Sequence, residues 1–209
     1  MSTFQGKVYS VQVDPEEIPG IEELGIPNFS RVSEIPDEVD YVVIAVPRRV
    51  APIVLKDCIA NGVGGIGMFT SGFAETNEPE GVQLQEEITR LAREADLVLL
   101  GPNCMGLYNP RLGVRFGQEQ PAGSSGPVTF ISQSGGHAAS FITAATANGI
   151  GINKVVSFGN GVVLENADYL EYFAADGASS VSLAYVEGVP DGRRFIERVR
   201  AVTSRQPLV

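Results

Sequence analysis

The chain has few of the side chains from which protein metal sites are built. Its 209 residues include one histidine, two cysteines and no tryptophan. Cys58 and Cys104 lie far apart and lack the short spacings that are typical of zinc ligands. We therefore expect no metal site, and the sparing use of cysteine favours a reducing, cytoplasmic location.

Basic residues are scarce as well. The sequence has 15 Lys and Arg residues against 25 Asp and Glu residues, which gives a formal net charge of −10. No basic stripe is available to neutralise a phosphate backbone, so we expect no nucleic-acid partner. An acidic protein can still bind an anion when local dipoles and backbone N–H groups supply the attraction.

Long apolar runs are also missing. No run approaches the ~18 residues that a membrane-spanning helix needs. The N-terminal residues 1–10 lack the apolar region of a signal peptide. We expect no membrane partner.

The glycine loop of a dinucleotide-binding domain is absent from the place where it belongs. Such a domain opens with a strand followed by G-x-G-x-x-G. Here the first strand-like run, residues 7–13, leads into Asp14 and Pro15 instead. The glycines within residues 62–67 follow a helical pattern and precede a strand, so they indicate an ordinary helix-to-strand turn.

What the chain does contain is a regular alternation of strands and helices. The strand-like runs occupy residues 7–13, 41–46, 66–70, 97–100, 128–131, 154–158 and 181–186. The helical patterns lie at residues 49–61, 80–95, 135–148, 166–174 and 191–203. Most strand runs are continuously apolar, as in parallel strands that are covered on both faces. This pattern predicts doubly wound parallel sheets, and residues 111–127 are typical of a linker between two of them.

Small or polar loops follow six of the predicted strands. Because ligands of such folds bind outside the carboxyl ends of the strands, these loops are the places to look for a site. They occupy residues 46–49, 70–73, 101–104, 132–136, 158–161 and 187–188.

The most informative loop is Ser132-Gln133-Ser134-Gly135-Gly136, between a strand and an alanine-rich helix. The first N–H groups of a helix have no partner within it, and its dipole makes that end positive. Two hydroxyls and two glycines there predict a seat for a phosphate or a carboxylate. His137, the only histidine, follows directly; it is a candidate substrate contact, although packing or capping is an equally good interpretation.

Several motifs resemble those of one enzyme family. They are residues 6–9 (GKVY), 35–40 (IPDEVD), 43–47 (VIAVP), 70–75 (TSGFAE), 101–106 (GPNCMG), 131–136 (ISQSGG) and 187–195 (EGVPDGRRF). In this order they resemble the NDP-forming acyl-CoA synthetases and the alpha subunit of succinyl-CoA synthetase. The resemblance implies an α/β fold with two consecutive parallel-sheet domains. Residues 1–118 would form an incomplete Rossmann-like CoA-binding domain, and residues 119–209 a flavodoxin-like ligase domain that is incomplete at its C-terminus.

The resemblance also implies a reaction and its partners. Members make an acyl-CoA from a small carboxylic acid and CoA, and they convert a nucleoside triphosphate to the diphosphate through an acyl phosphate and a phosphohistidine. ATP or another NTP, with Mg²⁺, would act only through an ATP-grasp domain or subunit. We expect an oligomer.

Site residues follow from the same resemblance. Glu187 matches the carboxylate that orients the phosphohistidine. The loop that holds the phosphoryl group is matched by Ser132, Ser134, Gly135 and Gly136. The positions on the CoA side are Val46, Pro47, Phe69, Thr70, Ser71, Asn103 and Cys104. For Cys104 a role as a small buried residue is the alternative, since no base is evident beside it.

The sequence also departs from the family. The first strand and glycine loop would lie before Met1, and the histidine loop would lie beyond Val209. The first strand-like run is followed by three acidic residues, Asp14, Glu16 and Glu17. Their negative charge would repel a phosphate of CoA. These departures predict a fragment or degenerate paralogue that is inactive alone.

Two other functions are compatible with parts of the pattern. The chain could be a non-catalytic regulatory module that binds CoA or an anion. The second alternative is a serine hydrolase with Ser134 as its nucleophile, because Ser134 lies in a strand–turn–helix segment. That enzyme needs a histidine from a separate loop, whereas His137 is on the same helix.

Overall fold

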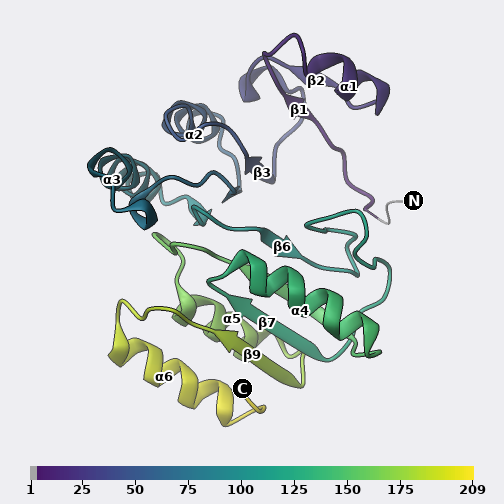
Figure 1. The fold of residues 1–209 in the computed structure, drawn as a ribbon, viewed down its shortest axis with the longest axis vertical. Helices are drawn as coiled ribbons and strands as arrows, with labels where there is room; N and C mark the ends of the chain where they lie inside the picture. Colours follow the sequence, from purple (N-terminus) through teal and green to yellow (C-terminus); the bar gives the residue numbers. More distant parts are fainter. Residues whose placement is uncertain (1–3) are drawn as a thin grey trace.

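The computed structural model describes residues 4–209 and contains two α/β units (Figure 1). The first unit comprises strands β1 to β5 with helices α1 to α3, and the second comprises β6 to β9 with α4 to α6. The predicted α/β fold, with two consecutive units built on parallel sheets, is confirmed. The first three residues of the predicted domain 1–118 lie outside the described residues.

The first unit holds two small parallel sheets. Its strands are β1 (Ser10–Val11), β2 (Asn28–Phe29), β3 (Tyr41–Ile44), β4 (Gly65–Met68) and β5 (Val98–Leu100). β1 pairs with β2, and β3, β4 and β5 form a separate sheet in that order. The helices are α1 (Ile18–Glu23), α2 (Ala51–Ala60) and α3 (Pro79–Glu94), with 3-10 turns η1 (Val32–Glu34) and η2 (Ala74–Thr76).

Helices α2 and α3 pack side by side on one face of the β3–β5 sheet (Figure 1). Leu55 of α2 and Ile88 of α3 are fully buried in one core with Ile44, Ile66 and Met68 of the strands. The burial of these side chains is what holds both helices on the sheet.

The opposite face of this sheet is only partly covered. Tyr41, Val43 and Val98 are 37%, 49% and 50% exposed. The tyrosine ring lies over β4, where a Cβ on Gly67 would be 1.9 Å from the Tyr41 hydroxyl. The interpretation of continuous apolar runs as strands covered on both faces is therefore wrong for this sheet.

The second unit is a four-stranded sheet between helices. Its strands are β6 (Gly106–Tyr108), β7 (Val128–Ser132), β8 (Ile152–Ser157) and β9 (Val181–Tyr185), in the order β6-β8-β7-β9. Only β6 is antiparallel to its neighbour. Helix α4 (Gly135–Ala147) covers one face, and α5 (Asn166–Asp176) and α6 (Gly192–Thr203) cover the other (Figure 1). Phe130 packs with the α4 core and Ile131 with the α5–α6 core, so β7 is buried on both faces.

All predicted strands and helices are present, with shifted ends. The first strand, predicted over residues 7–13, is much shorter, while α1, β2 and β6 were not predicted. The boundary between residues 118 and 119 stays a prediction, and β6, which joins the second sheet, already begins at Gly106.

None of the helices formed by residues 4–209 combines the length and the apolar character needed to cross a membrane. The longest, α3, has 16 residues and carries several charges.

Replacing Leu55 by Ala is expected to destabilise the first unit. Leu55 is fully buried under α2, so the change removes apolar contacts and leaves a cavity. The free energy of unfolding should fall by about 2–5 kcal/mol. The control is Ile53→Ala on the same helix, where the side chain is 66% exposed and the loss should stay below about 1 kcal/mol. Denaturant unfolding measures both, and equal losses would contradict this packing.

Candidate functional site

The 132–136 loop joins β7 to α4 and is shaped by its own serines. Ser132 is fully buried; its hydroxyl donates to the Ser134 carbonyl oxygen (2.7 Å) and accepts from the Ser134 N–H (3.2 Å). Ser134 is the N-cap of α4, and its hydroxyl accepts from the N–H of His137 at 3.3 Å. Both hydroxyls therefore fix the loop, which presents the start of the helix.

The amides of Gly135 and Gly136 are the donors that this loop leaves for a ligand. Intrahelical hydrogen bonding cannot satisfy the N–H groups of a first turn. Here the Ser134 side chain and carbonyl take the N–H groups of His137 and Ala138, the next two residues. The helix dipole adds positive potential at the two glycines, so this is the part of the loop best suited to an anion.

His137 does not point at Ser134 as a base would. Its ring stacks on Tyr185 at the end of β9, with 4.2 Å between ring centroids and 25° between planes. Ser134 is already used as a helix cap, and His137 is the only histidine in the sequence. This arrangement argues against a serine hydrolase.

Glu187 lies beside the 132–136 loop because Gln133 connects the two. The Gln133 side-chain oxygen accepts from the N–H groups of Glu187 (2.5 Å) and Gly188 (2.8 Å). From the other side, the Asn166 side chain donates to the Gly188 carbonyl oxygen at 3.0 Å. The role of Gln133 was missed in the sequence, where only its place between two serines could have drawn attention to it.

The three loops that are predicted to contact CoA lie next to one another at the carboxyl ends of β3, β4 and β5. The Thr70 hydroxyl donates to the Val46 carbonyl oxygen at 2.7 Å, and the Asn103 N–H donates to the Thr70 carbonyl oxygen at 2.9 Å. Val46–Pro47, Phe69–Ser71 and Asn103–Cys104 are thereby brought together, as parallel strands require. Asn103 has a φ of 58°, a conformation that asparagine adopts more readily than most residues.

Cys104 is a buried packing residue here. Its thiol donates to the Met68 carbonyl oxygen at 3.3 Å, and burial raises its pKa to about 12. Cys58 in α2 is also buried, and burial raises its pKa to about 11. Neither thiol is a thiolate at neutral pH, so neither is suited to act as a nucleophile.

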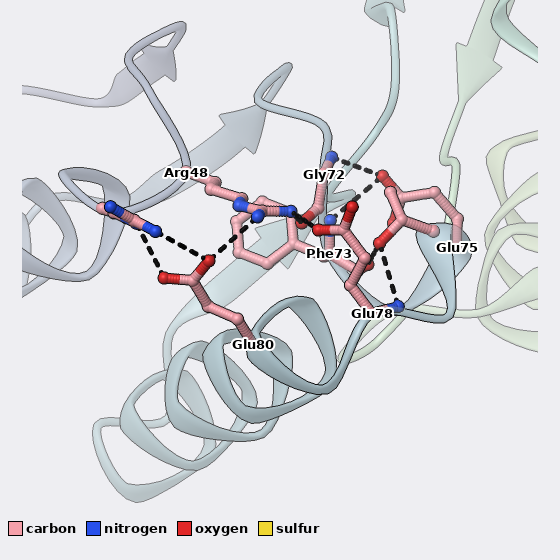
Figure 2. Close-up of polar contacts among 8 residues, drawn as sticks. Arg48, Gly72, Phe73, Glu75, Glu78 and Glu80 are labelled. Carbon is pink, nitrogen blue, oxygen red and sulfur yellow. Dashed lines mark hydrogen bonds and ion pairs between the residues drawn. The ribbon is translucent and has the colours of Figure 1, made fainter.

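The cations at the end of β3 are held by the protein's own acids (Figure 2). The Arg48 guanidinium donates to Glu78 (2.7 Å), to Glu80 (2.9 Å) and to the Gly72 carbonyl oxygen (2.8 Å). Arg49 forms a two-point ion pair with Glu80. These arginines fix the start of α3 against the 70–73 loop.

The two units meet where the 101–105 loop reaches the ends of β7 and β8. The Met105 N–H donates to the hydroxyl of Ser157, which is fully buried at the end of β8 (3.0 Å). The Met105 side chain lies against Gly135: a Cβ on that glycine would be 2.8 Å from the Met105 Cγ. The predicted phosphate and CoA positions therefore lie at one shared edge. Within residues 4–209, no group of three or more His, Cys, Asp or Glu residues could hold a metal ion.

Two family models match the chain. Residues 3–110 match a model described as "CoA binding domain", and residues 125–209 match "Succinyl-CoA ligase like flavodoxin domain".

Curated relatives match over the full chain but are much longer. Acetate–CoA ligase [ADP-forming] I of Archaeoglobus fulgidus is 35% identical over 209 residues, which are 100% of this chain and 30% of the relative. Acetate–CoA ligase [ADP-forming] II subunit alpha of Pyrococcus furiosus is 37% identical over 98% of this chain and 43% of the relative. The chain thus spans less than half the length of these relatives.

Solved structures share the fold. A Pyrococcus horikoshii crystal structure is 33% identical with a TM-score of 0.88, covering 99% of this chain and 46% of that chain. The dinucleotide-forming acetyl-coenzyme A synthetase 1 of Ca. Korarchaeum cryptofilum, in complex with phosphate and ADP, is 34% identical with a TM-score of 0.86. Here the coverage is 98% of this chain and 43% of that one.

Neither cysteine of the folded chain is expected to react with a thiol reagent such as Ellman's reagent at pH 8. Both are buried, and both pKa values are raised above that pH, so the reactive thiolate is scarce and shielded. Absorbance should show no rapid labelling without denaturant and two thiols per chain in guanidinium chloride. Fast labelling of the native protein would contradict the burial of the two thiols.

Proposed function

The chain belongs to the NDP-forming acyl-CoA synthetase family, and on that premise we propose that it supplies the CoA-binding and ligase-core portion of an acid–thiol ligase. The complete reaction joins a small carboxylic acid to CoA and converts a nucleoside triphosphate to diphosphate and phosphate. Since the chain spans 30% and 43% of two such relatives, we propose that it does not catalyse the reaction alone.

The observation that carries this proposal is the contact between the 101–105 loop and the start of α4. Met105 bonds to Ser157 and packs on Gly135, so the loop proposed to receive the thiol adjoins the loop proposed to hold a phosphoryl group. Transfer of an acyl group from phosphate to a thiol needs these two parts at one place.

The 132–136 loop has the chemistry for a phosphoryl group. The Gly135 and Gly136 amides at a helix start favour oxygen anions and need no basic side chain, which suits a chain of net charge −10. A related synthetase has been solved in complex with phosphate and ADP, which supports phosphate binding by members of this family. Glu187, positioned by Gln133, would orient an imidazole supplied from outside this chain.

The strand ends of the first unit suit the neutral part of CoA. CoA would supply the thiol that takes up the acyl group. The Thr70 and Asn103 loops offer uncharged polar groups, which fit the amide-containing pantetheine arm. The fit is poorer for the nucleotide phosphates, because Arg48 and Arg49 are occupied by Glu78 and Glu80. Asp14, Glu16 and Glu17, which follow β1, add negative charge.

We propose two partners for the missing steps. An ATP-grasp domain or subunit would bind the nucleotide and Mg²⁺, and a loop carrying histidine would move the phosphoryl group. The name of one relative, "subunit alpha", supports assembly with a second subunit. A small carboxylic acid is the proposed acyl donor.

A phosphate titration tests the proposed anion site. Inorganic phosphate should shift the amide signals of Gly135 and Gly136 in ¹⁵N NMR spectra. Ser134→Asp keeps a good helix cap but puts a carboxylate beside the site, so phosphate affinity should fall about tenfold or more. Ser140→Asp adds the same charge to an exposed position farther along α4 and should change affinity less than threefold. Equal losses in the two variants, or shifts confined to other residues, would contradict the assignment.

Reconstitution distinguishes the ligase portion from a non-catalytic binding module. The chain alone should make no acetyl-CoA from acetate, CoA and ATP. Fused to the remaining portion of a related alpha subunit and mixed with an ATP-grasp subunit, it should form acetyl-CoA. A fusion that is folded and binds CoA but stays inactive would favour the binding module, and activity of the chain alone would contradict the proposed division of the site.

A further inference from the structure

Residues 158–163, which follow β8 of the second unit, lie on the first unit. The Asn160 N–H donates to the Pro102 carbonyl oxygen at 3.0 Å, and Val162 and Val163 pack against the core under α2 and α3. At Gly159 the fit leaves no room for a side chain, because a Cβ would be 2.2 Å from the carbonyl oxygens of Pro102 and Asn103. The segment is therefore tightly packed between the units.

Within this segment, both the nitrogen and the oxygen of the Asn160 side chain form hydrogen bonds with residues of the first unit. Its nitrogen donates to Glu75 at 2.7 Å and to Gln85 of α3 at 2.8 Å. Its oxygen accepts from the Asn103 side chain at 3.3 Å. An amide has two N–H donors and one oxygen, and here all three groups have partners in the first unit.

Two of these partners control the loops on the CoA side. Glu75 uses its other oxygen to accept from the N–H groups of Gly72 (2.6 Å) and Phe73 (3.1 Å), which closes the 70–73 loop (Figure 2). Burial opposes the charge on Glu75, but the hydrogen bonds from Asn160 and the loop amides outweigh it and lower the pKa. The carboxylate therefore stays charged at neutral pH, where it is the stronger acceptor.

The second partner that controls one of these loops is Asn103. Its left-handed backbone makes the 101–105 loop turn sharply, and its side chain is held by Asn160. Asn160 thus reaches both the 70–73 loop and the 101–105 loop from a strand end beside the 132–136 loop, since β8 and β7 are adjacent.

We propose that Asn160 is a positioning residue for CoA. It holds the Thr70–Ser71 and Asn103–Cys104 positions at a fixed place relative to the 132–136 loop, without touching the ligand itself. This inference rests on the proposed function and adds to it Asn160, which lies outside all seven sequence motifs that resemble the family.

Calorimetric titration of the full chain with CoA, and separately with inorganic phosphate, tests this role. Asn160→Ala should bind CoA about tenfold more weakly, because two loops lose their common anchor. Phosphate affinity should stay within about twofold, because the 132–136 loop is held by bonds inside the second unit. The ratio of the two affinities distinguishes positioning from a general loss of structure.

Asn160→Asp adds a pH signature. At pH 7.5 its carboxylate faces the Glu75 carboxylate and should weaken CoA binding at least as much as Ala does. Near pH 5.5 a shared proton can bridge two such carboxyl groups, so CoA affinity should partly recover. Asn160→Ala should show no comparable recovery over the same range.

The matched control is Asn153→Ala. Asn153 also donates through its side-chain amide, but to Ser125 and Ala178, away from the CoA-side loops. The Asn153→Ala variant should bind CoA and inorganic phosphate with the same affinities as the unmodified chain. Unchanged CoA affinity in Asn160→Ala, or a parallel loss of CoA and phosphate affinity with a lower melting temperature, would overturn the inference. Failure of the unmodified chain to bind CoA would instead contradict the proposed function, and this inference with it.

Discussion

The close contact between the 101–105 loop and the ends of β7 and β8 is the constraint on which the site depends. A backbone N–H of Met105 reaches a buried serine at the end of β8, Gly159 leaves no space over the Pro102–Asn103 carbonyls, and Met105 lies on Gly135. In the proposed site each unit contributes one half, because the loops proposed to receive a thiol and the helix start proposed to hold a phosphoryl group belong to different sheets. Bringing the carboxyl ends of both sheets to one edge places these groups together.

The two halves of the proposed site differ in their electrostatics. At the start of α4 the helix supplies unpartnered amides and a favourable dipole, so an anion can be held with no cation nearby. At the end of β4 the corresponding amides, those of Gly72 and Phe73, are already occupied by the Glu75 carboxylate, and Arg48 is occupied by Glu78 and Glu80. The first unit is thereby left with neutral polar loops. An acidic protein can in this way separate the place for a phosphoryl group from the place for a neutral chain such as pantetheine.

Much of this arrangement could be predicted from local patterns. Period and composition located every long helix, and the strand–turn–helix around Ser134 identified the N-cap, because these features depend on neighbours in the sequence. Short or exposed elements such as β2 and α1 carry too few apolar residues to be seen, and β6 pairs with β8, about fifty residues away. The loops that contain Gln133 and Asn160 were identified as candidate site loops, but the hydrogen-bonding roles of the two side chains could not be predicted. These roles depend on partners such as Glu187 and Glu75, which only the fold brings within reach. The open face of the β3–β5 sheet likewise depends on what packs there, not on the apolar run itself.

The central claim is that a thiol held by the first unit lies next to the start of α4 in the second. The most direct measurement uses CoA carrying a nitroxide spin label on its sulfur, bound to ¹⁵N-labelled chain. The account predicts strong paramagnetic broadening of the amide signals of Gly135 and Gly136, together with those of Asn103 and Met105, and its loss when unlabelled CoA displaces the probe. Specific binding that leaves the Gly135 and Gly136 signals sharp would contradict the account, since the two halves would then not form one site.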